Sequence, residues 1–355
     1  MGLTRLSIRN FRCISSADLE FDPTLNLIIG KNASGKTSLI EAVYLLGRGR
    51  SFRAGNLEAA IRTGSAEFQI HGLTTHPRSA IPLPVGLVQS HRQLLAKIAG
   101  MAPENLASLS ENFPVQLIDS QAHQLIGGGP RSRRQFLDWG VFHVEPAFFP
   151  SWRKYQRALQ QRNALLRAKR ALKEMAGWDE ELVVHGNALD RMRRAYLANL
   201  LPTALQWASQ ALGGAEINLD YHSGWPEELS LSTAIEKTIH RDYESGSTRC
   251  GPHRAEISIR INGNAARERI SMGQEKVLAG SLLLAQTVIY RSLTGRVCTL
   301  LLDDFPSELD SIHQQRFLQR VLETGSQTLI TAIESGQWIM DVAAKLFHVE
   351  QGKIT

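Results

Sequence analysis

One loop, Gly30-Lys31-Asn32-Ala33-Ser34-Gly35-Lys36-Thr37, constrains this chain more than any other feature. It follows the apolar run Leu25–Ile29 and precedes apolar residues at helical spacing from Leu39 to Leu46, so a buried strand, a loop and a helix follow one another. The loop matches G-x-x-x-x-G-K-[ST], in which backbone N–H groups face phosphates, the lysine reaches the β and γ oxygens and the hydroxyl ligates Mg²⁺. A chance match would lack this flanking context. The residues from Gly30 to Thr37 are therefore predicted to bind a nucleotide.

An apolar strand that ends in two carboxylates supplies the next part of such a site. In Leu300-Leu301-Leu302-Asp303-Asp304, Asp303 is placed to hold Mg²⁺ and Asp304 to orient or activate the attacking water. Alone, the segment also fits a strand that ends in a solvated acidic turn. Paired with the loop, it predicts ATP and Mg²⁺ as ligands and Lys36, Asp303 and Asp304 as catalytic residues.

The order of the remaining elements predicts an α/β fold in three parts. Residues 1–125 contain segments typical of antiparallel strands, followed by the buried strand Val115–Ile118. Residues 126–205 are rich in Ala, Leu, Arg and Gln and predict an inserted helical lobe. Residues 206–355 return to strands and end in the alternation of a parallel α/β sheet. We therefore expect a head of mixed antiparallel and parallel sheets with a helical insertion.

Composition limits the class of protein without fixing its function. With 355 residues, 43% of them apolar, the chain can bury a large core, which excludes a disordered or fibrous protein. The apolar stretches are short of the roughly 20 residues of a membrane-spanning helix, and the three cysteines form no CxxC pair. The net charge of +6 favours an anionic partner without proving one. We expect a soluble, cytoplasmic protein with no membrane partner.

Two further motifs narrow the class of nucleotide-binding protein. Ser271-Met272-Gly273-Gln274 begins a predicted helix before the acidic strand, and Ser307-Glu308-Leu309-Asp310 follows that strand. On its own the first motif is equally an ordinary helix N-cap. In this order the two resemble the signature motif and D-loop of ABC-type ATPases, in which the signature serine of one subunit contacts the γ-phosphate on the other. The resemblance implies that Ser271, Gly273 and Gln274 bind the nucleotide of a partner copy.

Further ordered motifs make the resemblance more specific. The 267 residues between Lys36 and Asp303 resemble the DNA-associated, SMC/Rad-like branch of these ATPases, but the insertion is too short, and too poor in heptads, for long coiled-coil arms. Over nearly its whole length the chain resembles the RecF family, in motifs that include Asn10-Phe11-Arg12, Arg50-Ser51-Phe52-Arg53, Gly129-Pro130-Arg131-Ser132-Arg133-Arg134-Gln135-Phe136-Leu137-Asp138, Gly251-Pro252-His253-Arg254 and Leu302-Asp303-Asp304-Phe305-Pro306.

This resemblance implies an ATP-dependent homodimer that acts in recombinational repair and replication restart. Such a dimer clamps double-stranded DNA near single-strand gaps, associates with the nucleoid, and works with RecO and RecR to load recombinase. ABC transporters usually place Glu after the magnesium Asp and His at the end of the next strand, whereas Asp304 and the run Leu329–Ile333 stand in those places here. We therefore expect a weak, DNA-dependent ATPase whose slow hydrolysis resets the clamp.

The resemblance also implies secondary sites. The Q-loop glutamine, which couples the metal and γ-phosphate to the helical lobe, is assigned to Gln121 in preference to Gln116. Arg12 is expected either to approach the nucleotide or the signature helix, or to be a surface cation. The cationic candidates for DNA phosphates are Arg48, Arg50, Arg53, Arg131, Arg133 and Arg134, with the run Arg167, Lys169, Arg170 and Lys173. Each cluster is alternatively a solvated face, and Asp138 lies at helical spacing from Arg134.

Two rival functions share part of this pattern. A small-molecule P-loop kinase would share the phosphate loop but has no use for the signature and D-loop motifs. A transporter ATPase subunit would need a membrane partner and the Glu and His that this chain lacks. The eleven histidines show no metal-ligand spacing, so Mg²⁺ with the nucleotide is the only metal implied.

Overall fold

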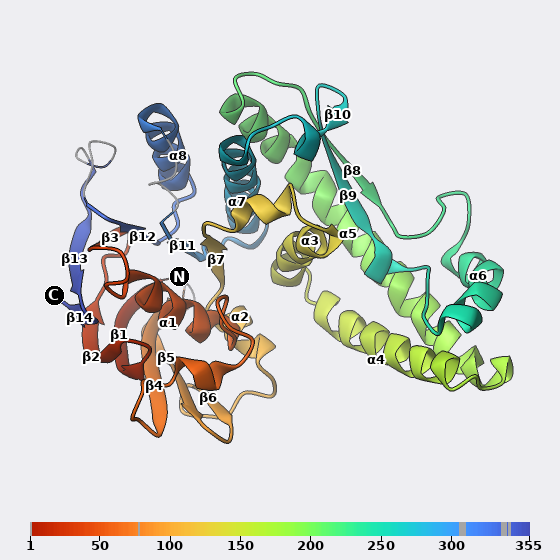
Figure 1. Ribbon diagram of the computed structural model, residues 1–355, viewed down its shortest axis with the longest axis horizontal. Coiled ribbons are helices and arrows are strands. Elements are labelled where there is room, and N and C mark those ends of the chain that lie inside the picture. Colours follow the sequence, from red (N-terminus) through yellow and green to blue (C-terminus); the bar gives the residue numbers. More distant parts are fainter. Residues whose placement is uncertain (1, 77–78, 305–309, 335–338, 340–341) are drawn as a thin grey trace. The chain divides into compact units, whose positions relative to one another are not determined.

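The chain divides into two compact units (Figure 1). The computed structural model describes residues 2–76, 79–304, 310–334, 339 and 342–355. Unit 1 is Met1–Ala122 with Thr287–Thr355, and unit 2 is His123–Gln286. Unit 2 is larger than the expected helical lobe, because residues 206–286, which the sequence analysis grouped with the carboxyl-terminal part of the head, are compact with the helices.

The first sheet of unit 1 is antiparallel. Its strands, in spatial order, are β2 (Ile14–Glu20), β1 (Leu3–Phe11), β4 (Glu67–His76), β5 (Ser79–Ser90) and β6 (Leu94–Ile98). Strands β1 and β2 confirm the expected antiparallel strands, with Leu6 opposite Leu19 and both side chains buried. Since one face of the sheet is covered, buried apolar residues are interspersed with polar and charged ones along both strands.

The second sheet of unit 1 carries the predicted parallel pattern. Its order is β14 (Lys353–Ile354), β13 (Lys345–Glu350), β3 (Leu25–Ile29), β12 (Thr328–Ala332), β11 (Thr299–Leu302) and β7 (Val115–Ile118). The strands from β13 to β7 are parallel, and β14 pairs antiparallel with β13. Every residue of β11 and β12 is buried, as expected for central parallel strands. The sequence analysis did not predict β13 and β14.

Helix α1 (Lys36–Arg48) packs between the two sheets of unit 1. It contacts β1, β4 and β5 of the first sheet and β7 and β12 of the second. Its apolar residues are therefore buried on all sides, and Leu39, Ile40, Val43 and Leu46 are fully buried. The helix ends at Gly49, whose left-handed conformation lets its N–H bond the Leu45 carbonyl.

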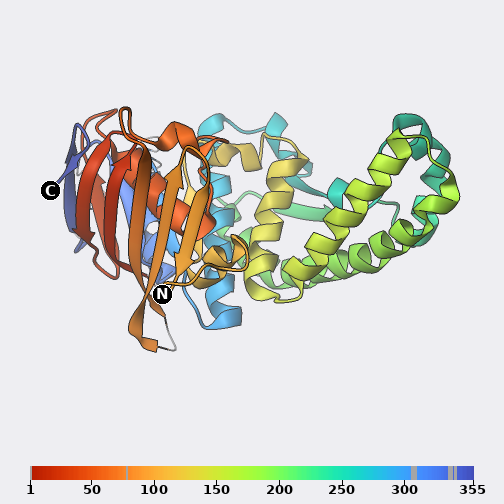
Figure 2. The same ribbon diagram turned by 90° about the horizontal axis from the view of Figure 1, so that it is seen from below.

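Unit 2 combines helices with a small sheet. The helices are α3 (Pro130–Val144), α4 (Phe148–Arg167), α5 (Ala176–Ala211) and α6 (Leu231–Ser245), and the sheet is β8 (Ile217–His222), β9 (Glu256–Ile261) and β10 (Asn264–Ala265). Figure 2 shows α4 and α5 side by side. The predicted helical content of residues 131–200 is confirmed, although Pro150 and Gly177 lie in the first turns of α4 and α5 and do not interrupt them. No helix of the described part exceeds the 36 residues of α5, and among the described residues there is no long coiled-coil arm.

Three further helices complete the described chain. They are α2 (Ala107–Asn112), α7 (Met272–Thr294) and α8 (Ser311–Glu323), and short 3-10 turns include η1 (Leu57–Ala60) and η4 (Pro252–Arg254). By length and composition α7 could cross a membrane, with a mean hydropathy of 1.3, so the chain does contain one apolar stretch longer than the sequence analysis recognised. Because 67% of the 18-residue segment with this hydropathy is buried, α7 has the pattern of a core helix.

Candidate functional site: a phosphate-binding loop beside a buried acidic edge

The phosphate-binding loop joins β3 to α1, as the sequence predicted. Two glycines are required by the close approach of other backbone and side-chain atoms. A Cβ on Gly30 would lie 2.2 Å from the Val349 carbonyl oxygen, and one on Gly35, which has φ of 120°, would lie 2.9 Å from Cys13 Sγ. The tight turn that results brings the start of α1 against the loop, where free helical N–H groups attract anions.

A cavity of about 600 Å³ opens over this loop. Its lining residues are Arg12, Cys13, Asn32, Ala33, Ser34, Gly35, Lys36, Thr37, Ser38, Arg53, Ala59, Ile61, Thr63 and Asp304. Lys36 is only 4% exposed, and its Nζ donates to the carbonyls of Gly30 and Lys31 at 2.8 and 3.1 Å. The buried Ser34 Oγ has no hydrogen-bond partner in the described part of the chain. An unsatisfied hydroxyl and an ammonium in a turn of backbone N–H groups fit a bound polyphosphate.

Carboxylates gather at the carboxyl ends of β7 and β11, beside the start of α1. Thr37 Oγ1 donates to Asp303 Oδ1 at 3.2 Å, and the Asp303 N–H donates to the Ile118 carbonyl at 3.0 Å, which brings Asp119 to the same edge. Burial raises the pKa of Asp303 to about 6, and the negative charges of Asp304 and Asp119 add to this shift.

The chemistry of this edge fits the expected magnesium ion. Mg²⁺ prefers oxygen ligands, and Thr37 and Asp303 supply a hydroxyl and a carboxylate within hydrogen-bond distance of each other. Thr331 of β12 also donates to Asp303 Oδ1 at 2.9 Å and accepts from the Asp304 N–H at 2.8 Å, so it fixes both acidic residues. The sequence analysis missed Asp119 and Thr331. Their positions at the ends of neighbouring parallel strands are the signal that could have identified them.

A buried carboxylate, Glu41 of α1, organises the cationic side of the cavity. Its side chain is 0% exposed and accepts from Arg12 Nε and Nη2 at 3.0 and 2.7 Å, from Arg53 Nη1 at 3.3 Å and from Ser51 Oγ at 2.5 Å. Arg12 also donates to the Ala59 carbonyl at 2.8 Å and is 18% exposed. Arg12 is therefore a fixed wall of the cavity and not a free surface cation. Its contact with a nucleotide stays a prediction.

The turn of the carboxyl-terminal hairpin of β13 and β14 contacts the phosphate-binding loop. The Gly352 N–H donates to the Ser34 carbonyl at 2.8 Å, so the hairpin turn is hydrogen-bonded to the phosphate-binding loop. Gly352 has φ of 79°, and a Cβ there would lie 2.2 Å from the Cys13 carbonyl oxygen. Two segments from opposite ends of the chain thus fix the loop's position.

The signature motif lies in unit 2, at the start of α7. The Ser271 hydroxyl accepts from the Gln274 N–H at 3.3 Å, and Gln274 Oε1 accepts from the Ser271 N–H at 3.0 Å, which forms a capping box. Ser271, Gly273 and Gln274 are all exposed. The motif is therefore an N-cap at an exposed helix start, and its role in binding the nucleotide of a second copy stays a prediction. Of the predicted D-loop, Ser307–Leu309 lie outside the described residues, and Asp310 caps α8 by accepting from the His313 N–H at 3.0 Å.

The proposed Q-loop residue has a less defined environment. Gln121 is exposed, and its N–H donates to Asp119 Oδ1 at 3.0 Å. Gln116 is 4% exposed and lies within β7. The position of Gln121 directly after the acidic edge suits the predicted role, which stays a prediction.

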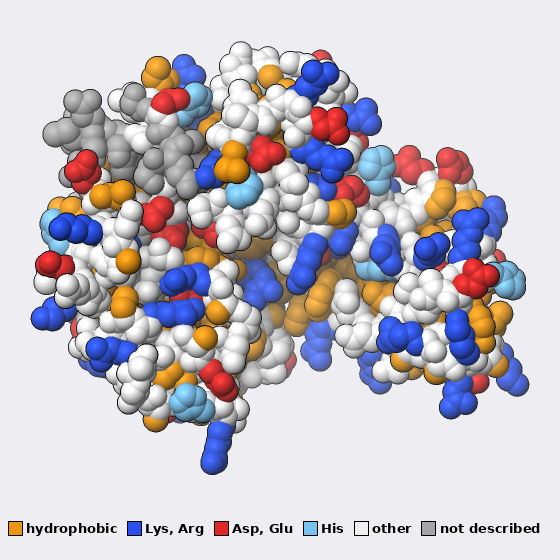
Figure 3. All heavy atoms as spheres, viewed as in Figure 1, with side chains coloured by type: hydrophobic (Ala, Val, Ile, Leu, Met, Phe, Trp, Pro, Cys, Tyr) orange, Lys and Arg blue, Asp and Glu red, His pale blue; other side chains and the backbone are white. Residues whose placement is uncertain are grey.

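Several predicted DNA-binding arginines make internal contacts. In Figure 3, Lys and Arg side chains are spread over the face of both units that this view shows. Arg133 pairs with Glu256 through Nε and Nη2 at 2.6 and 2.9 Å, and Arg134 donates to the Ala255 carbonyl at 2.8 Å. Arg53 pairs with Glu41, and burial lowers the pKa of Arg48. These internal contacts favour structural roles. Arg50, Arg53 and Arg131 are the exposed members of the set, and of these Arg53 is paired with Glu41.

One expected pair is wrong. Asp138 accepts from Arg193 of α5, from Nε at 2.8 Å and from Nη2 at 3.0 Å, and not from Arg134 at helical spacing. Arg193 is 2% exposed and also donates to the Pro252 carbonyl at 2.8 Å. It thereby ties α3 and α5 to the 3-10 turn η4, a long-range role that helical spacing does not reveal.

Comparisons with known proteins give a family and similar structures. The family model of the RecF/RecN/SMC N terminal domain matches residues 2–355. The DNA replication and repair protein RecF of Vibrio cholerae serotype O1 is 38% identical over 360 residues, covering 100% of this chain and 99% of that protein. The solved recombination mediator protein RecF-ATPrS in the RecFOR pathway superposes with a TM-score of 0.89 at 26% identity, covering 99% and 97% of the two chains.

A more distant likeness concerns the fold alone. The SMC head bound to the C-winged helix domain of ScpA superposes with a TM-score of 0.63 at 14% identity, covering 100% of this chain and 97% of that one. Together with the closer structural match, it confirms the predicted α/β ATPase head with mixed sheets and a helical insertion.

Proposed function

Because the chain belongs to the RecF family, within the RecF/RecN/SMC N-terminal domain family, we propose that it is an ATP-binding protein of DNA replication and repair. One observation carries the proposal. The phosphate-binding loop, with its unsatisfied Ser34 hydroxyl, lies beside the acidic edge around Asp303, so a single cavity offers both a phosphate cradle and a metal ligand. RecF proteins solved with ATP and with ATPrS have the same fold.

The residues of this chain divide the work of holding and cleaving ATP. Backbone N–H groups of the loop bind the phosphates, and Lys36 leaves its loop carbonyls to reach the β and γ oxygens. Thr37 and Asp303 would hold Mg²⁺, which neutralises charge on the phosphates when it is bound. Asp304, fixed by Thr331, accepts a hydrogen bond from the attacking water and orients it.

ATP acts as the ligand that closes a dimer. The exposed helix start at Ser271 is an anion site on the surface of unit 2, and we place it on the γ-phosphate held by the loop of a second copy. A ligand shifts an equilibrium only by its difference in affinity for the two states. ATP bound between two copies has that difference, because the signature contact exists only in the closed dimer.

The closed dimer clamps double-stranded DNA near single-strand gaps. It associates with the nucleoid and works with RecO and RecR to help load recombinase. Hydrolysis is slow and DNA-dependent and resets the clamp, since Asp304 is one methylene shorter than the Glu of transporter ATPases and reaches less far toward the water. Turnover at transporter-like rates in the presence of DNA would contradict this part of the proposal.

The decisive experiment measures the mass of the protein in solution by light scattering, with and without ATP and Mg²⁺. Ser271→Asp keeps a good N-cap but places a carboxylate against the partner's γ-phosphate, and Ser271→Thr keeps both the cap and the hydroxyl. We expect wild type and Ser271→Thr to dimerise on ATP, while Ser271→Asp binds ATP as a monomer and Lys36→Met binds it poorly. If Ser271→Asp dimerises at the ATP concentration that dimerises the wild-type protein, the shared site is contradicted.

A further inference from the structure

Every charged side chain of helix α4 in unit 2 is a cation, and four of these five cations are exposed to solvent. Its sequence, FFPSWRKYQRALQQRNALLR, contains no Asp or Glu. Arg153, Arg157 and Arg167 recur at helical spacing and are exposed, and Lys154 is exposed beside them. In Figure 3, Lys and Arg side chains predominate at the lower right, where α4 lies in Figure 1.

None of these four cations forms an ion pair with a described carboxylate. In the described part of the chain the ion pairs of unit 2 involve His185 and other arginines. This distinguishes the four cations from Arg133 and Arg134, whose guanidinium groups are used within the fold. From Arg153 to Arg167 the row runs for about 20 Å at the rise of an α-helix. A row of this length spans several phosphates of a nucleic-acid backbone.

Aromatic side chains lie at the amino-terminal end of this row. Trp152 is 36% exposed and stacks on Phe149, with ring centroids 6.4 Å apart and planes 12° apart. Phe142 of α3 supports Phe149 edge-on at 5.8 Å, and Arg153 lies 5.8 Å from the Phe149 centroid. A solvent-exposed indole held parallel to a second ring offers a rigid surface on which an unpaired base can stack.

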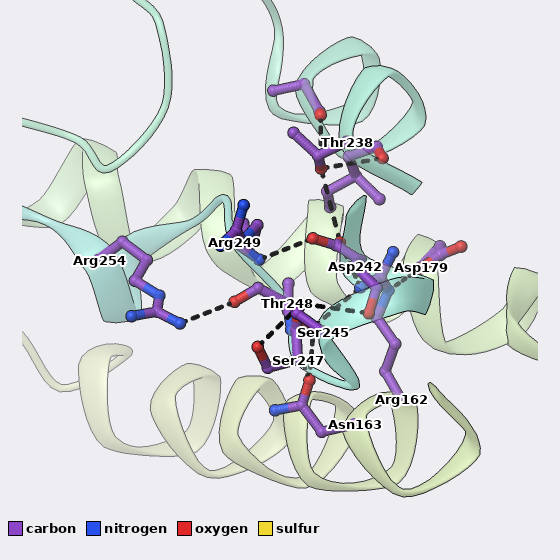
Figure 4. Close-up of polar contacts among 12 residues, drawn as sticks. Arg162, Asn163, Asp179, Thr238, Asp242, Ser245, Ser247, Thr248, Arg249 and Arg254 are labelled. Carbon is purple, nitrogen blue, oxygen red and sulfur yellow. Dashed lines mark hydrogen bonds and ion pairs between the residues drawn. The ribbon is translucent and has the colours of Figure 1, made fainter. Parts of the chain in front are cut away.

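The opposite side of α4 is fixed to the rest of unit 2. Figure 4 shows Arg162, which is fully buried, donating to Asp179 of α5 at 2.5 Å and to Asp242 of α6 at 2.7 Å. The same guanidinium donates to Thr248 Oγ1 at 2.9 Å. These bonds orient the helix about its axis, so the cationic row and Trp152 stay on the solvent side.

We propose that the outer face of α4 is a binding site for single-stranded DNA, with backbone phosphates on Arg153, Arg157 and Arg167 and one base stacked on Trp152. The inference rests on the proposed DNA-binding function and goes beyond it, because it assigns the single-stranded side of a gap to the outer face of α4. Of the cations that the sequence analysis named for DNA phosphates, only Arg167 belongs to this face. Cations supply sequence-independent affinity, and the aromatic platform distinguishes an unpaired base from a paired one.

The test measures binding by fluorescence anisotropy over a salt series, in ATP and Mg²⁺, with three labelled probes. These are a 20-nucleotide oligo(dT), a phosphodeoxyribose oligomer of the same length without bases, and a blunt duplex. Arg153→Gln with Arg157→Gln is expected to reduce the salt slope for both single-stranded probes by about 1.4, at roughly 0.7 per lost phosphate contact. Trp152→Leu is expected to weaken oligo(dT) binding roughly 5- to 100-fold, with an unchanged salt slope and no effect on the other two probes. Arg241→Gln, an exposed cation of α6, is the matched control and should behave as wild type.

The outcomes separate this inference from the proposed function. If wild type binds DNA and dimerises on ATP while the α4 variants bind oligo(dT) with wild-type affinity and slope, the α4 site is wrong and the proposed function stands. If Trp152→Leu weakens binding of the probe without bases as much as binding of oligo(dT), the proposed stacking of a base on Trp152 is wrong. If wild type binds none of the probes, both proposals fail. Unchanged thermal midpoints of the variants show that the loss is not unfolding.

Discussion

At the scale of single residues, the acidic edge of the cavity is a place where function costs stability. Asp303 is 7% exposed, and burial raises its pKa to about 6, so at neutral pH the fold keeps an ionised carboxylate in a poorly solvated place. The folded protein therefore binds this proton more tightly than the unfolded chain, in which the pKa is near 3.8. The cost is absent below about pH 4, grows as the pH rises to 6 and is complete above that value.

Replacement of this carboxylate is accordingly expected to stabilise the protein without nucleotide. Asp303→Asn should raise the free energy of unfolding of unit 1 by roughly 2–3 kcal/mol at pH 7.5 and by little near pH 4, while ATP with Mg²⁺ no longer stabilises it. Thermal midpoints between pH 4 and 8, with and without ATP and Mg²⁺, measure both effects. An equal shift at pH 4 and pH 7.5 would show that the charge of Asp303 is not the cause.

Glu41 differs from Asp303, because two arginine side chains compensate its buried negative charge. Glu41→Gln keeps the shape of the side chain but leaves Arg12 and Arg53 without their carboxylate, which is expected to lower the free energy of unfolding by about 3 kcal/mol. It also frees both guanidinium groups to move out of the cavity wall, so the affinity for ATP should fall. Urea unfolding and ATP titration measure the two effects. Glu58→Gln, an exposed carboxylate of η1, is the control and should change neither.

At the scale of elements, the carboxyl-terminal hairpin and the phosphate-binding loop depend on each other. Gly352→Ala would place a methyl group 2.2 Å from the Cys13 carbonyl oxygen at a backbone φ of 79°, so the turn must shift. The hydrogen bond from Gly352 to Ser34 then weakens and the loop loses its support. We expect a lower thermal midpoint and an ATP affinity at least several-fold weaker. Gly64→Ala is the matched control, since Gly64 has φ of 86° but open space around its Cβ position.

The buried arginine of α4 makes a second prediction at this scale. Arg162→Met leaves Asp242, which is 0% exposed, without its cation and is expected to lower the free energy of unfolding by about 3–5 kcal/mol. Adding Asp242→Leu should recover much of that loss, because two apolar side chains then replace a buried ion pair. Urea midpoints of the single and double variants measure the recovery. If the double variant is less stable than Arg162→Met, the stability lost in Arg162→Met does not come from the unpaired charge of Asp242.

What the sequence could and could not predict follows from the range of each interaction. The loop, Asp303 and the parallel strands were predictable, because phosphate and metal chemistry require a fixed local pattern of residues. The role of Arg133 was not, since its partner Glu256 lies 123 residues away and an unpaired arginine looks the same in sequence. Strand β13 was also missed, because only Phe347 and Val349 of its six residues are buried and its apolar signal is short.

At the scale of the whole molecule, the two units carry complementary halves of one proposed site. Unit 1 holds the loop and the acidic edge, while the signature residues belong to unit 2. If two copies share each ATP, bound ATP slows amide hydrogen exchange in the loop and in the signature motif under different conditions. The loop is protected whenever ATP binds, whereas the signature is protected only when a second copy is present. Protein concentration therefore separates the two effects.

Hydrogen exchange measured by mass spectrometry at low and high protein concentration tests this directly. With ATP at about 100 times its dissociation constant, amides from Gly30 to Thr37 should exchange roughly 100-fold more slowly at both concentrations, since binding stabilises unit 1 by about 2.7 kcal/mol. Amides of residues 273–275 should slow only at the higher concentration, where copies associate. Lys36→Met should abolish both effects and Ser271→Asp only the second, because its carboxylate repels the γ-phosphate while its cap is kept. Protection of residues 273–275 in dilute protein would mean that one copy closes on its own nucleotide, and the dimer would then need another cause.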